Sequence, residues 1–297
     1  MSPITELSGL ELINEPLSKY TTWRIGGPAD KLYKPAGIHD LVLFLKQCDL
    51  HEPLTWLGLG SNSLVRDRGV SGTVILTQGC LKGLELLNDG LIRVEAGVSC
   101  AQMARFSARL GLHGGEFWAG IPGTMGGALR MNAGCFQGET WDSVIEVETI
   151  TRTGEIRRRK PSEFAIAYRS LMGLETDEWF IAATCRLVSG EKEIALQRIK
   201  TLLTQRANTQ PTSEYNCGSV FRNPPGDYAA RLIESCGLKG FFKGGAKISE
   251  KHANFIINHE GRASAHDIET LMLHVHAEIL QRTGVDLIRE VHIVGEK

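Results

Sequence analysis

Apolar residues recur at helical spacing in three stretches of the chain, and each stretch carries an end signal. Residues 38–48 place apolar side chains three and four positions apart, as on one face of a helix, and His51 and Pro53 follow as the end signal. Capping-box patterns begin at Ser99 and Ser264, and glycines that are typical helix stops follow at Gly111 and Gly284. The pattern therefore predicts helices over about 38–48, 99–111 and 264–284.

Strand-like sequence dominates the middle of the chain. Residues 91–97 and 144–150 are rich in Val and Ile, and Thr153-Gly154 predicts a turn behind the second run. The other elements that we expect are a short strand at 54–57, a polar helix at 191–206, a linker at 208–213 and a closing strand at 287–294.

This order of elements predicts an α+β protein without internal repeats or low-complexity tracts. Changes in element type divide it into three ranges, which we expect to be domains or subdomains: 1–72, 73–207 and 208–297. The last range alone carries a long amphipathic helix followed by a strand, so we expect a separate α+β unit there.

The composition narrows the class of protein further. The chain has 297 residues, 42% of them hydrophobic, with 33 Lys and Arg against 34 Asp and Glu, which excludes disordered, collagen-like and disulfide-scaffold proteins. Near-neutral charge argues against nucleic acid or an anionic membrane as a partner. The N-terminus does not resemble a signal peptide and no stretch is apolar enough to span a membrane, so we expect a cytoplasmic protein with reduced thiols.

Two glycine-rich segments are candidates for binding a phosphate group. The first, Gly58–Ser63, follows a strand but lacks the third glycine, the helix and the distant acidic residue of a Rossmann site. It can be an anion-binding nest of main-chain N–H groups or a plain turn, and the residues do not decide between the two. The second, Gly120–Ala128, has no Lys after its last glycine, so a nucleoside triphosphate site is not expected. Together they suggest a diphosphate held by main-chain donors, as in FAD.

A third candidate surface is Cys217–Pro224, which contains Ser219, Arg222 and Asn223. The alternative is a strand closed by Asn-Pro, in which Ser219 only fills space. No G-x-S-x-G pattern is present, which argues against a serine hydrolase. The histidines have no ligand-spaced partners, so we expect no metal site. Cys135 and Cys217 lack an activating base in the sequence and are expected to be small apolar fillers.

Seven ordered segments resemble the flavoprotein family of UDP-N-acetylenolpyruvoylglucosamine reductases (MurB). They are Tyr20–Ala29, Gly58–Val65, Gly120–Gly127 with Met131–Gly134, Tyr168–Ser170, Gly218–Pro224, Gly244–Ala246 with Ser249–Phe255, and Glu290–Val291. The resemblance covers nearly the whole chain.

The resemblance implies an FAD-binding fold of the vanillyl-alcohol-oxidase type in two α+β subdomains, plus a C-terminal α+β substrate domain. It implies that NADPH reduces FAD, and that hydride then passes to C3 of UDP-N-acetylglucosamine enolpyruvate, with protonation at C2 giving UDP-N-acetylmuramate. The catalytic residues that it implies are Arg169, Ser219 and Glu290.

The resemblance and the glycine patterns also define two candidate binding sets. The cofactor-binding set is Arg24, Gly58, Gly60, Ser61, Asn62, Ser63, Gly120, Ile121, Pro122, Gly123, Gly126 and Gly127. The substrate-binding set is Tyr168, Arg222, Asn223, Lys251, His252 and Asn254.

The chemistry of the reaction agrees with the three implied catalytic roles. Hydride addition at C3 leaves carbanion density at C2 that spreads into the carboxylate, so the site needs donors aimed at oxygen and an acid near C2. Arg169 can fork onto a carboxylate, Glu290 can help only if it is protonated, and Ser219 needs help because serine is a very weak acid. Without the family pattern, the default interpretations are that Arg169 is a salt-bridged residue at a strand end, that Ser219 is structural, and that Glu290 is a solvated residue at the rim.

Only 49 residues separate Arg169 from Ser219, so the chain resembles the shorter family type, which lacks an inserted tyrosine loop. We expect Tyr215, Arg222, Asn223 and the 251–254 segment to cover the nucleotide instead. The competing interpretations are a flavin oxidase with the same fold and a non-catalytic nucleotide-binding protein. We expect a monomer, and we expect Arg157–Lys160 to be a solvated strand face.

Overall fold

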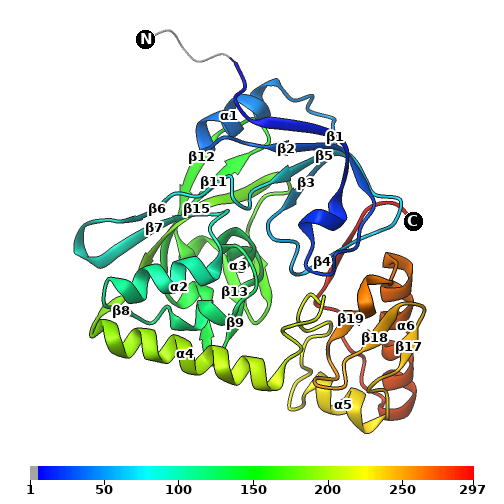
Figure 1. The fold of residues 1–297 in the computed structure, drawn as a ribbon. Coiled ribbons are helices and arrows are strands. Elements are labelled where there is room, and N and C mark those ends of the chain that lie inside the picture. The colour runs from blue at the N-terminus through cyan, green and yellow to red at the C-terminus, as the bar shows by residue number, and fades with distance from the viewer. Residues whose placement is uncertain (1–5) are drawn as a thin grey trace. The chain divides into compact units, whose positions relative to one another are not determined.

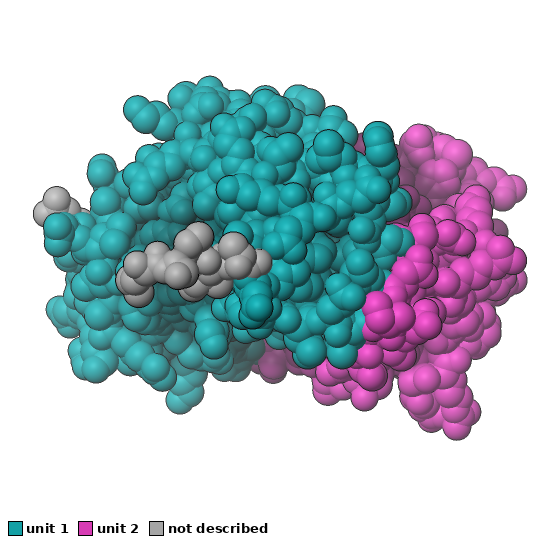
Figure 2. Space-filling model, turned by 90° about the horizontal axis from the view of Figure 1, so that it is seen from above, with its two compact units in different colours: residues 1–12, 31–58, 72–204 teal, residues 13–30, 59–71, 205–297 magenta. Residues whose placement is uncertain are grey.

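The computed structural model describes residues 6–297, and their contacts divide the chain into two compact units. Figure 1 shows the fold, and Figure 2 colours the two units. Unit 1 contains the described residues up to Leu12, Lys31–Gly58 and Gly72–Thr204; unit 2 contains Ile13–Asp30, Leu59–Ser71 and Gln205–Lys297. Two early segments therefore belong with the C-terminal part of the chain. The ranges 1–72, 73–207 and 208–297 stay a prediction.

Unit 1 is built on a five-stranded antiparallel sheet. Its strands, in the order β12-β11-β15-β7-β6, are Ile156–Arg159, Val144–Thr151, Glu178–Arg186, Leu91–Glu95 and Leu84–Leu86. The strands predicted at 91–97 and 144–150 are β7 and β11, and the turn predicted at Thr153-Gly154 joins β11 to β12. Alternating apolar residues in these strands supply side chains to two separate cores.

Helices contribute to both cores. Helices α2 (Cys100–Arg109), α3 (Met125–Met131) and α4 (Lys192–Thr209) pack in the larger core, whereas α1 (Ile38–Gln47) packs in the smaller one. The predicted capping box of α2 is present, because the Ser99 side chain accepts from Gln102 N and the Gln102 side chain accepts from Ser99 N. Helix α4 runs past the predicted end at 206, so the linker expected from 208 begins inside the helix.

A four-stranded sheet has the order β1-β2-β5-β3, with bounds Leu10–Pro16, Pro28–Lys34, Val70–Leu76 and Leu54–Leu57. Strand β3 is the strand predicted at 54–57 and pairs in parallel with β5. The short two-stranded pairs are β9 (Gly134–Cys135) with β10 (Gly138–Glu139), β13 (Ala165–Ala167) with β14 (Ser170–Met172), and β8 (Leu112–His113) with β16 (Val188–Ser189). Single 3₁₀ turns lie at Leu17–Tyr20, Asn88–Gly90, Glu116–Gly120, Thr140–Asp142, Pro161–Glu163 and His259–Gly261.

Unit 2 packs a three-stranded sheet and two helices around one core. The elements are α5 (Ala229–Ser235), β17 (Phe242–Lys243), β18 (Ala246–Ile248), β19 (Ile256–Asn258) and α6 (Ala265–Thr283). Helix α6 has the predicted Ser264–Asp267 capping box, and Gly284 ends it with φ 72°, a left-handed conformation that suits glycine. Trp23 and Leu64 are fully buried in the same core, which explains why their segments belong to unit 2.

The closing strand is shorter than the predicted range of 287–294. Strand β20 covers only His292–Val294 and pairs in parallel with β4 (Ser63–Val65). A bend at Val291 interrupts the extended chain, and Arg289 forms an isolated antiparallel bridge with Phe221. The chain therefore changes its pairing partner on either side of Glu290. None of the helices in residues 6–297 is long and apolar enough to cross a bilayer.

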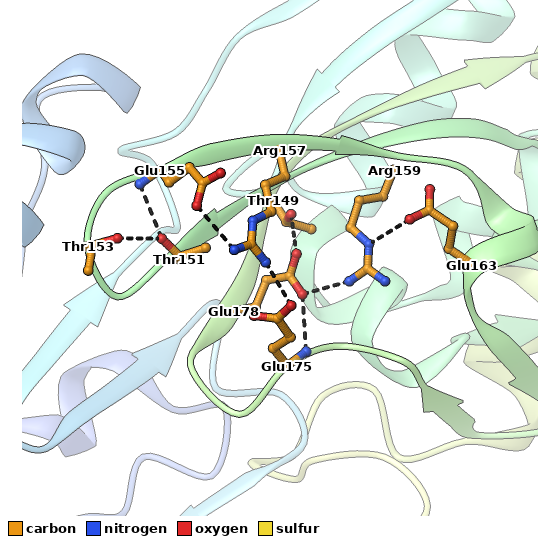
Figure 3. A network of polar contacts seen from close by, with 9 residues as sticks. All are labelled: Thr149, Thr151, Thr153, Glu155, Arg157, Arg159, Glu163, Glu175 and Glu178. Carbon is orange, nitrogen blue, oxygen red and sulfur yellow. Dashed lines mark hydrogen bonds and ion pairs between the residues drawn. The ribbon is translucent and has the colours of Figure 1, made fainter.

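The basic run Arg157–Lys160 is only partly the solvated face that we expected (Figure 3). The Arg158 side chain is 74% exposed, but that of Arg159 is only 15% exposed and lies 2.6 Å from a Glu178 carboxylate oxygen. The Glu178 side chain is fully buried and also accepts from Thr149 Oγ1 at 2.5 Å and from Glu175 N at 3.1 Å. Burying a carboxylate requires such partners, so the network fixes β12 and β15 around it.

Replacing Glu178 with Gln should lower the free energy of unfolding by about 3 kcal/mol, because Arg159 would lose its buried counter-charge. Urea unfolding would measure the change. Glu155→Gln is the matched control, since Glu155 pairs with Arg157 in the same network but is 60% exposed. Equal effects of the two substitutions would contradict a special role for the buried carboxylate.

Candidate functional site

The first glycine segment, residues 58–63, connects β3 to β4. Gly60 has φ 62°, and a Cβ there would lie 2.3 Å from the Tyr20 carbonyl oxygen. A Cβ on Gly58 would lie 2.5 Å from Thr124 Oγ1. Both distances are shorter than real Cβ contacts, so these glycines let the segment pack against the protein's own chain. That packing sets the path of the segment.

Main-chain donors of this segment are available to an anion. Within residues 6–297 nothing accepts a hydrogen bond from the N–H groups of Ser61 and Asn62. The Asn62 side chain has a different task, because its Nδ2 donates to the Glu290 carbonyl oxygen at 3.1 Å. The main-chain carbonyl oxygen of Asn62 accepts from His292 N at 3.0 Å. Anion binding by the Ser61 and Asn62 N–H groups therefore stays a prediction.

The second glycine segment contains the start of a helix that the sequence did not predict. Thr124 is the N-cap of α3, and its Oγ1 accepts from Gly127 N at 3.5 Å. A Cβ on Gly126 would lie 2.9 Å from the Ala96 Cβ, and one on Gly120 would lie 2.7 Å from the Phe136 ring. The close approach that the glycines predicted is therefore to neighbouring protein. Two glycines within a seven-residue helix hide the apolar spacing that would have revealed it.

Arg169 lies in a two-residue turn, with Tyr168, between β13 and β14. Its φ is 52°, and its guanidinium donates to the carbonyl oxygens of Gly134 at 2.6 Å and Asn132 at 3.4 Å. The guanidinium carbon also lies 4.9 Å from the centre of the Tyr168 ring. These contacts within unit 1 are to carbonyl oxygens and an aromatic ring, and they hold the cation beside the end of α3.

Asn132 supports the same turn, and the sequence analysis did not single it out. It ends α3 in a left-handed conformation with φ 41° and is 1% exposed. Its Nδ2 donates to Glu139 Oε2 at 2.8 Å and to the Ala167 carbonyl oxygen at 3.3 Å, while its Oδ1 accepts from Trp141 N at 3.2 Å. The only signal in the sequence was an asparagine after a glycine-rich run, since asparagine tolerates the left-handed conformation that often ends a helix.

Ser219 lies in the serine segment, residues 216–222, which is fixed by main-chain bonds. Asn216 Oδ1 accepts from Gly218 N at 2.9 Å, and the Val220 carbonyl oxygen accepts from Glu290 N at 2.8 Å. The Ser219 side chain is half-buried, and its hydroxyl has no hydrogen-bond partner within residues 6–297.

Glu290 is half-buried at the bend before β20. Its main-chain N–H donates to Val220 in the serine segment, and its carbonyl oxygen accepts from Asn62 in the first glycine segment.

Burial and the neighbouring Glu290 charge raise the pKa of the Cys217 thiol well above its usual range. Cys217 is 5% exposed and packs in the core of unit 2. The Cys217 thiol thus stays protonated at neutral pH. The other cysteine, Cys135 in unit 1, donates through Sγ to the Phe117 carbonyl oxygen at 3.1 Å.

The remaining candidates in unit 2 differ in whether their side chains already have hydrogen-bond partners within the protein. Arg222 Nε is buried without a hydrogen-bond partner in the described residues, so this guanidinium can still take an acceptor. Asn223 Oδ1 accepts from Ala229 N at the start of α5. Lys251 Nζ donates to the Ala207 carbonyl oxygen, and burial lowers the pKa of His252. Asn254 is 3% exposed and bonds to both main-chain polar groups of Phe221.

Six candidates are exposed, namely Arg24, Pro122, Gly127, Tyr168, Asn223 and Lys251. Arg24, assigned to the cofactor set, has φ 59° and donates to the Lys19 carbonyl oxygen at 3.0 Å. Tyr168, assigned to the substrate set, is 46% exposed. Both assignments stay predictions.

Two family models match the chain. Residues 210–294 match the model described as UDP-N-acetylenolpyruvoylglucosamine reductase, C-terminal domain, and residues 29–159 match the one described as FAD binding domain.

Relatives match over nearly the full chain. A UDP-N-acetylenolpyruvoylglucosamine reductase of Legionella pneumophila (strain Corby) is 69% identical over 295 residues, covering 99% of this chain and 96% of that protein. One from Alkalilimnicola ehrlichii is 55% identical over 282 residues, covering 95% and 94%. The crystal structure of UDP-N-acetylenolpyruvylglucosamine reductase from Thermus caldophilus is 32% identical with a TM-score of 0.82, covering 98% of this chain and all of that one.

Asn132→Ala should lower the free energy of unfolding by about 4 kcal/mol, because three side-chain hydrogen bonds worth about 1 kcal/mol each disappear and Ala must adopt φ 41°, which costs about 1 kcal/mol more. Asn132→Gly removes the same bonds but tolerates the backbone, and should recover about 1 kcal/mol. Urea unfolding of both variants measures the difference. A glycine variant that is less stable than the alanine variant would contradict the backbone part of this explanation.

Proposed function

The chain belongs to the family of UDP-N-acetylenolpyruvoylglucosamine reductases, and from this we propose that it is an FAD-dependent reductase in peptidoglycan precursor synthesis. It uses NADPH to reduce UDP-N-acetylglucosamine enolpyruvate to UDP-N-acetylmuramate. The observation that carries the proposal is 69% identity to a reductase of this name across 99% of the chain. The α+β fold matches that of a reductase of this name, and residues 29–159 match an FAD binding domain, which we propose to be of the vanillyl-alcohol-oxidase type.

The FAD diphosphate is proposed to bind main-chain donors of the first glycine segment, because the N–H groups of Gly123, Gly126 and Gly127 in the second segment already donate within the protein. The unpaired N–H groups of Ser61 and Asn62 fit a negatively charged group, and glycine keeps the neighbouring main chain free of bulk. The rest of the proposed cofactor-binding set is Arg24, Gly58, Gly60, Ser63, Gly120, Ile121, Pro122, Gly123, Gly126 and Gly127. Bound FAD supplies the hydride transfer from NADPH to C3 of the substrate.

Arg169 is proposed to stabilise the charge that develops on the substrate carboxylate after hydride reaches C3. Its positive charge persists at every working pH, and a planar fork of N–H donors matches a carboxylate. The carbonyl oxygens of Gly134 and Asn132 orient the guanidinium before substrate arrives. Such preorganisation is what makes a donor effective in the transition state.

Glu290 and Ser219 are proposed to manage protons at the same substrate. Glu290 is proposed to act in its protonated form, because only a neutral carboxyl can donate to the growing negative charge. Ser219 is proposed to give its hydroxyl proton to C2. Since no described side chain hydrogen-bonds to this hydroxyl, water is the proposed source of the replacing proton.

Substrate binding is proposed for Tyr168, Arg222, Asn223, Lys251 and His252, in a protein of the shorter type without a tyrosine loop. The buried, unpartnered Nε of Arg222 supports its part in this set, because a phosphate or carboxylate would satisfy it. We also propose a cytoplasmic monomer. The balance of 33 basic and 34 acidic residues supports the further proposal that it binds neither nucleic acid nor membrane.

The test is to follow the two half-reactions of the purified flavoprotein separately. NADPH should bleach the flavin absorbance, and UDP-N-acetylglucosamine enolpyruvate should restore it without oxygen. Ser219→Ala should leave the first step within about twofold and slow the second by at least about 100-fold, the usual scale of a lost general acid. Restoration only by oxygen would instead indicate an oxidase, and a colourless protein would indicate a nucleotide-binding protein without flavin chemistry.

Gly60→Ala should yield protein with little bound flavin. The Cβ would collide with the Tyr20 carbonyl oxygen, so the main chain around Ser61 and Asn62 must move. Gly79→Ala is the control, since Gly79 also has a positive φ, 72°, but has nothing within 4 Å of the added Cβ. The ratio of flavin to protein absorbance after purification measures the effect. Equal flavin content in the two variants would refute the role of the first glycine segment.

A further inference from the structure

We propose that Asn254 is a positioning residue for Ser219. Its carboxamide fixes the main chain of the serine segment, so that the Ser219 hydroxyl is held where C2 of the substrate is protonated. This inference rests on the proposed function and gives Asn254 a different task from the substrate contact that the sequence resemblance implied.

The pairing of the serine segment creates a need for this side chain. Phe221 and Arg289 face each other in an antiparallel bridge, flanked by the bonds from Glu290 N to the Val220 carbonyl oxygen and from Arg222 N to the Ile288 carbonyl oxygen, both 2.8 Å. Phe221 and Arg289 are therefore a non-hydrogen-bonded pair, in which the N–H and C=O of each residue point away from the other. The two polar groups of Phe221 need partners on that outer side.

Asn254 supplies both partners. Its Oδ1 accepts from Phe221 N at 3.0 Å, and its Nδ2 donates to the Phe221 carbonyl oxygen at 2.8 Å. One carboxamide thus takes the place that a neighbouring strand would occupy in a regular sheet. The main chain of Asn254 adds a third bond, because its carbonyl oxygen accepts from Val220 N at 2.9 Å.

Burial makes these bonds hard to replace. Asn254 and Phe221 are each 3% exposed, so water cannot satisfy the Phe221 N–H and C=O groups if the carboxamide is removed. Two unsatisfied buried groups would force the main chain to shift. Ser219 lies one residue from Val220, and within residues 6–297 its hydroxyl has no hydrogen bond that could hold it. Its location therefore depends on the main chain.

A small shift of Ser219 affects one half-reaction selectively. The hydroxyl acts only when the proton reaches C2, whereas the reduction of flavin by NADPH does not use it. A displacement of about 1 Å at a reacting group costs on the order of 100-fold in rate. Removing the Asn254 carboxamide should therefore slow the second half-reaction and spare the first.

Asn258 provides a matched control within the same unit. It is also 3% exposed and also uses both ends of its carboxamide, with Nδ2 donating to the Trp23 carbonyl oxygen at 2.9 Å and Oδ1 accepting from Ala263 N at 2.8 Å. Its bonds do not reach the serine segment. Asn258→Ala removes the same group from an equally buried place.

The experiment measures both anaerobic half-reactions by stopped flow, and the melting temperature, for Asn254→Ala, Asn254→Asp, Asn258→Ala, Ser219→Ala and the Ser219→Ala/Asn254→Ala double variant. Asn254→Ala should slow flavin reoxidation by substrate by about 100-fold and leave reduction by NADPH within about twofold. Asn254→Asp keeps the acceptor and loses the donor, so about 10-fold is expected. Asn258→Ala should lower the melting temperature as much as Asn254→Ala while keeping the two half-reactions in the wild-type ratio.

The double variant separates positioning from a general structural effect. If Asn254 acts only through Ser219, the double variant should reoxidise no more slowly than Ser219→Ala within about twofold. Multiplied losses, or equal slowing of both half-reactions by Asn254→Ala, would overturn the inference. If Asn254→Ala retains no flavin, the comparison of Asn254→Asp with Asn258→Ala decides the same question. A wild-type protein that substrate cannot reoxidise would refute the proposed function instead.

Discussion

Hydrogen bonds join the serine segment to Asn254 on one side and to residues 288–290 on the other, and they fix the part of unit 2 that contains Ser219. No regular strand runs through this region, so its main-chain polar groups are not paired by a continuous strand ladder. A main chain without a full ladder must satisfy its buried polar groups one at a time, and here asparagine side chains do so. Asn62 likewise bonds to the main chain of Glu290, and in unit 1 Asn132 supports the turn that holds Arg169. Irregular chain gives freedom to place functional groups, and buried carboxamides restore the rigidity.

Much of the regular structure follows from local sequence. Helices α1, α2 and α6 combine an apolar stripe with an end signal, and strands β7 and β11 have the Val and Ile content of buried strands. Local preference and burial agree at these places, so the pattern alone was sufficient. Helix α3 was missed because its two glycines weaken both helix propensity and the apolar stripe. The closing strand was overestimated because alternation continues through a bend at Val291, where the pairing partner changes from Phe221 to β4.

The candidate site was predictable only in part, and for a similar reason. Glycine and serine motifs can be read along the chain, and they led to the correct family. The supporting residues cannot be read in this way, since the bonds of Asn254 to Phe221 and of Asn132 to Ala167 span 33 and 35 positions. The burial of Glu178, which turns Arg159 from a surface residue into a buried counter-ion, also depends on pairing between strands. Sequence motifs indicate candidate reacting groups, whereas tertiary contacts determine which residues hold them in place.

The early segments of unit 2 have a consequence for how the protein is made. The Trp23 indole donates to the Ile256 carbonyl oxygen at 2.8 Å across 233 positions, and the Asn258 side chain donates to the Trp23 carbonyl oxygen. During synthesis, residues 13–30 leave the ribosome long before the helices and strands that bury them exist. Unit 2 therefore cannot complete its core until residues 256–279 have emerged, and the burial of Trp23 is among the last features to form. Until then this segment presents apolar surface, which makes it a natural target for chaperones acting on the nascent chain.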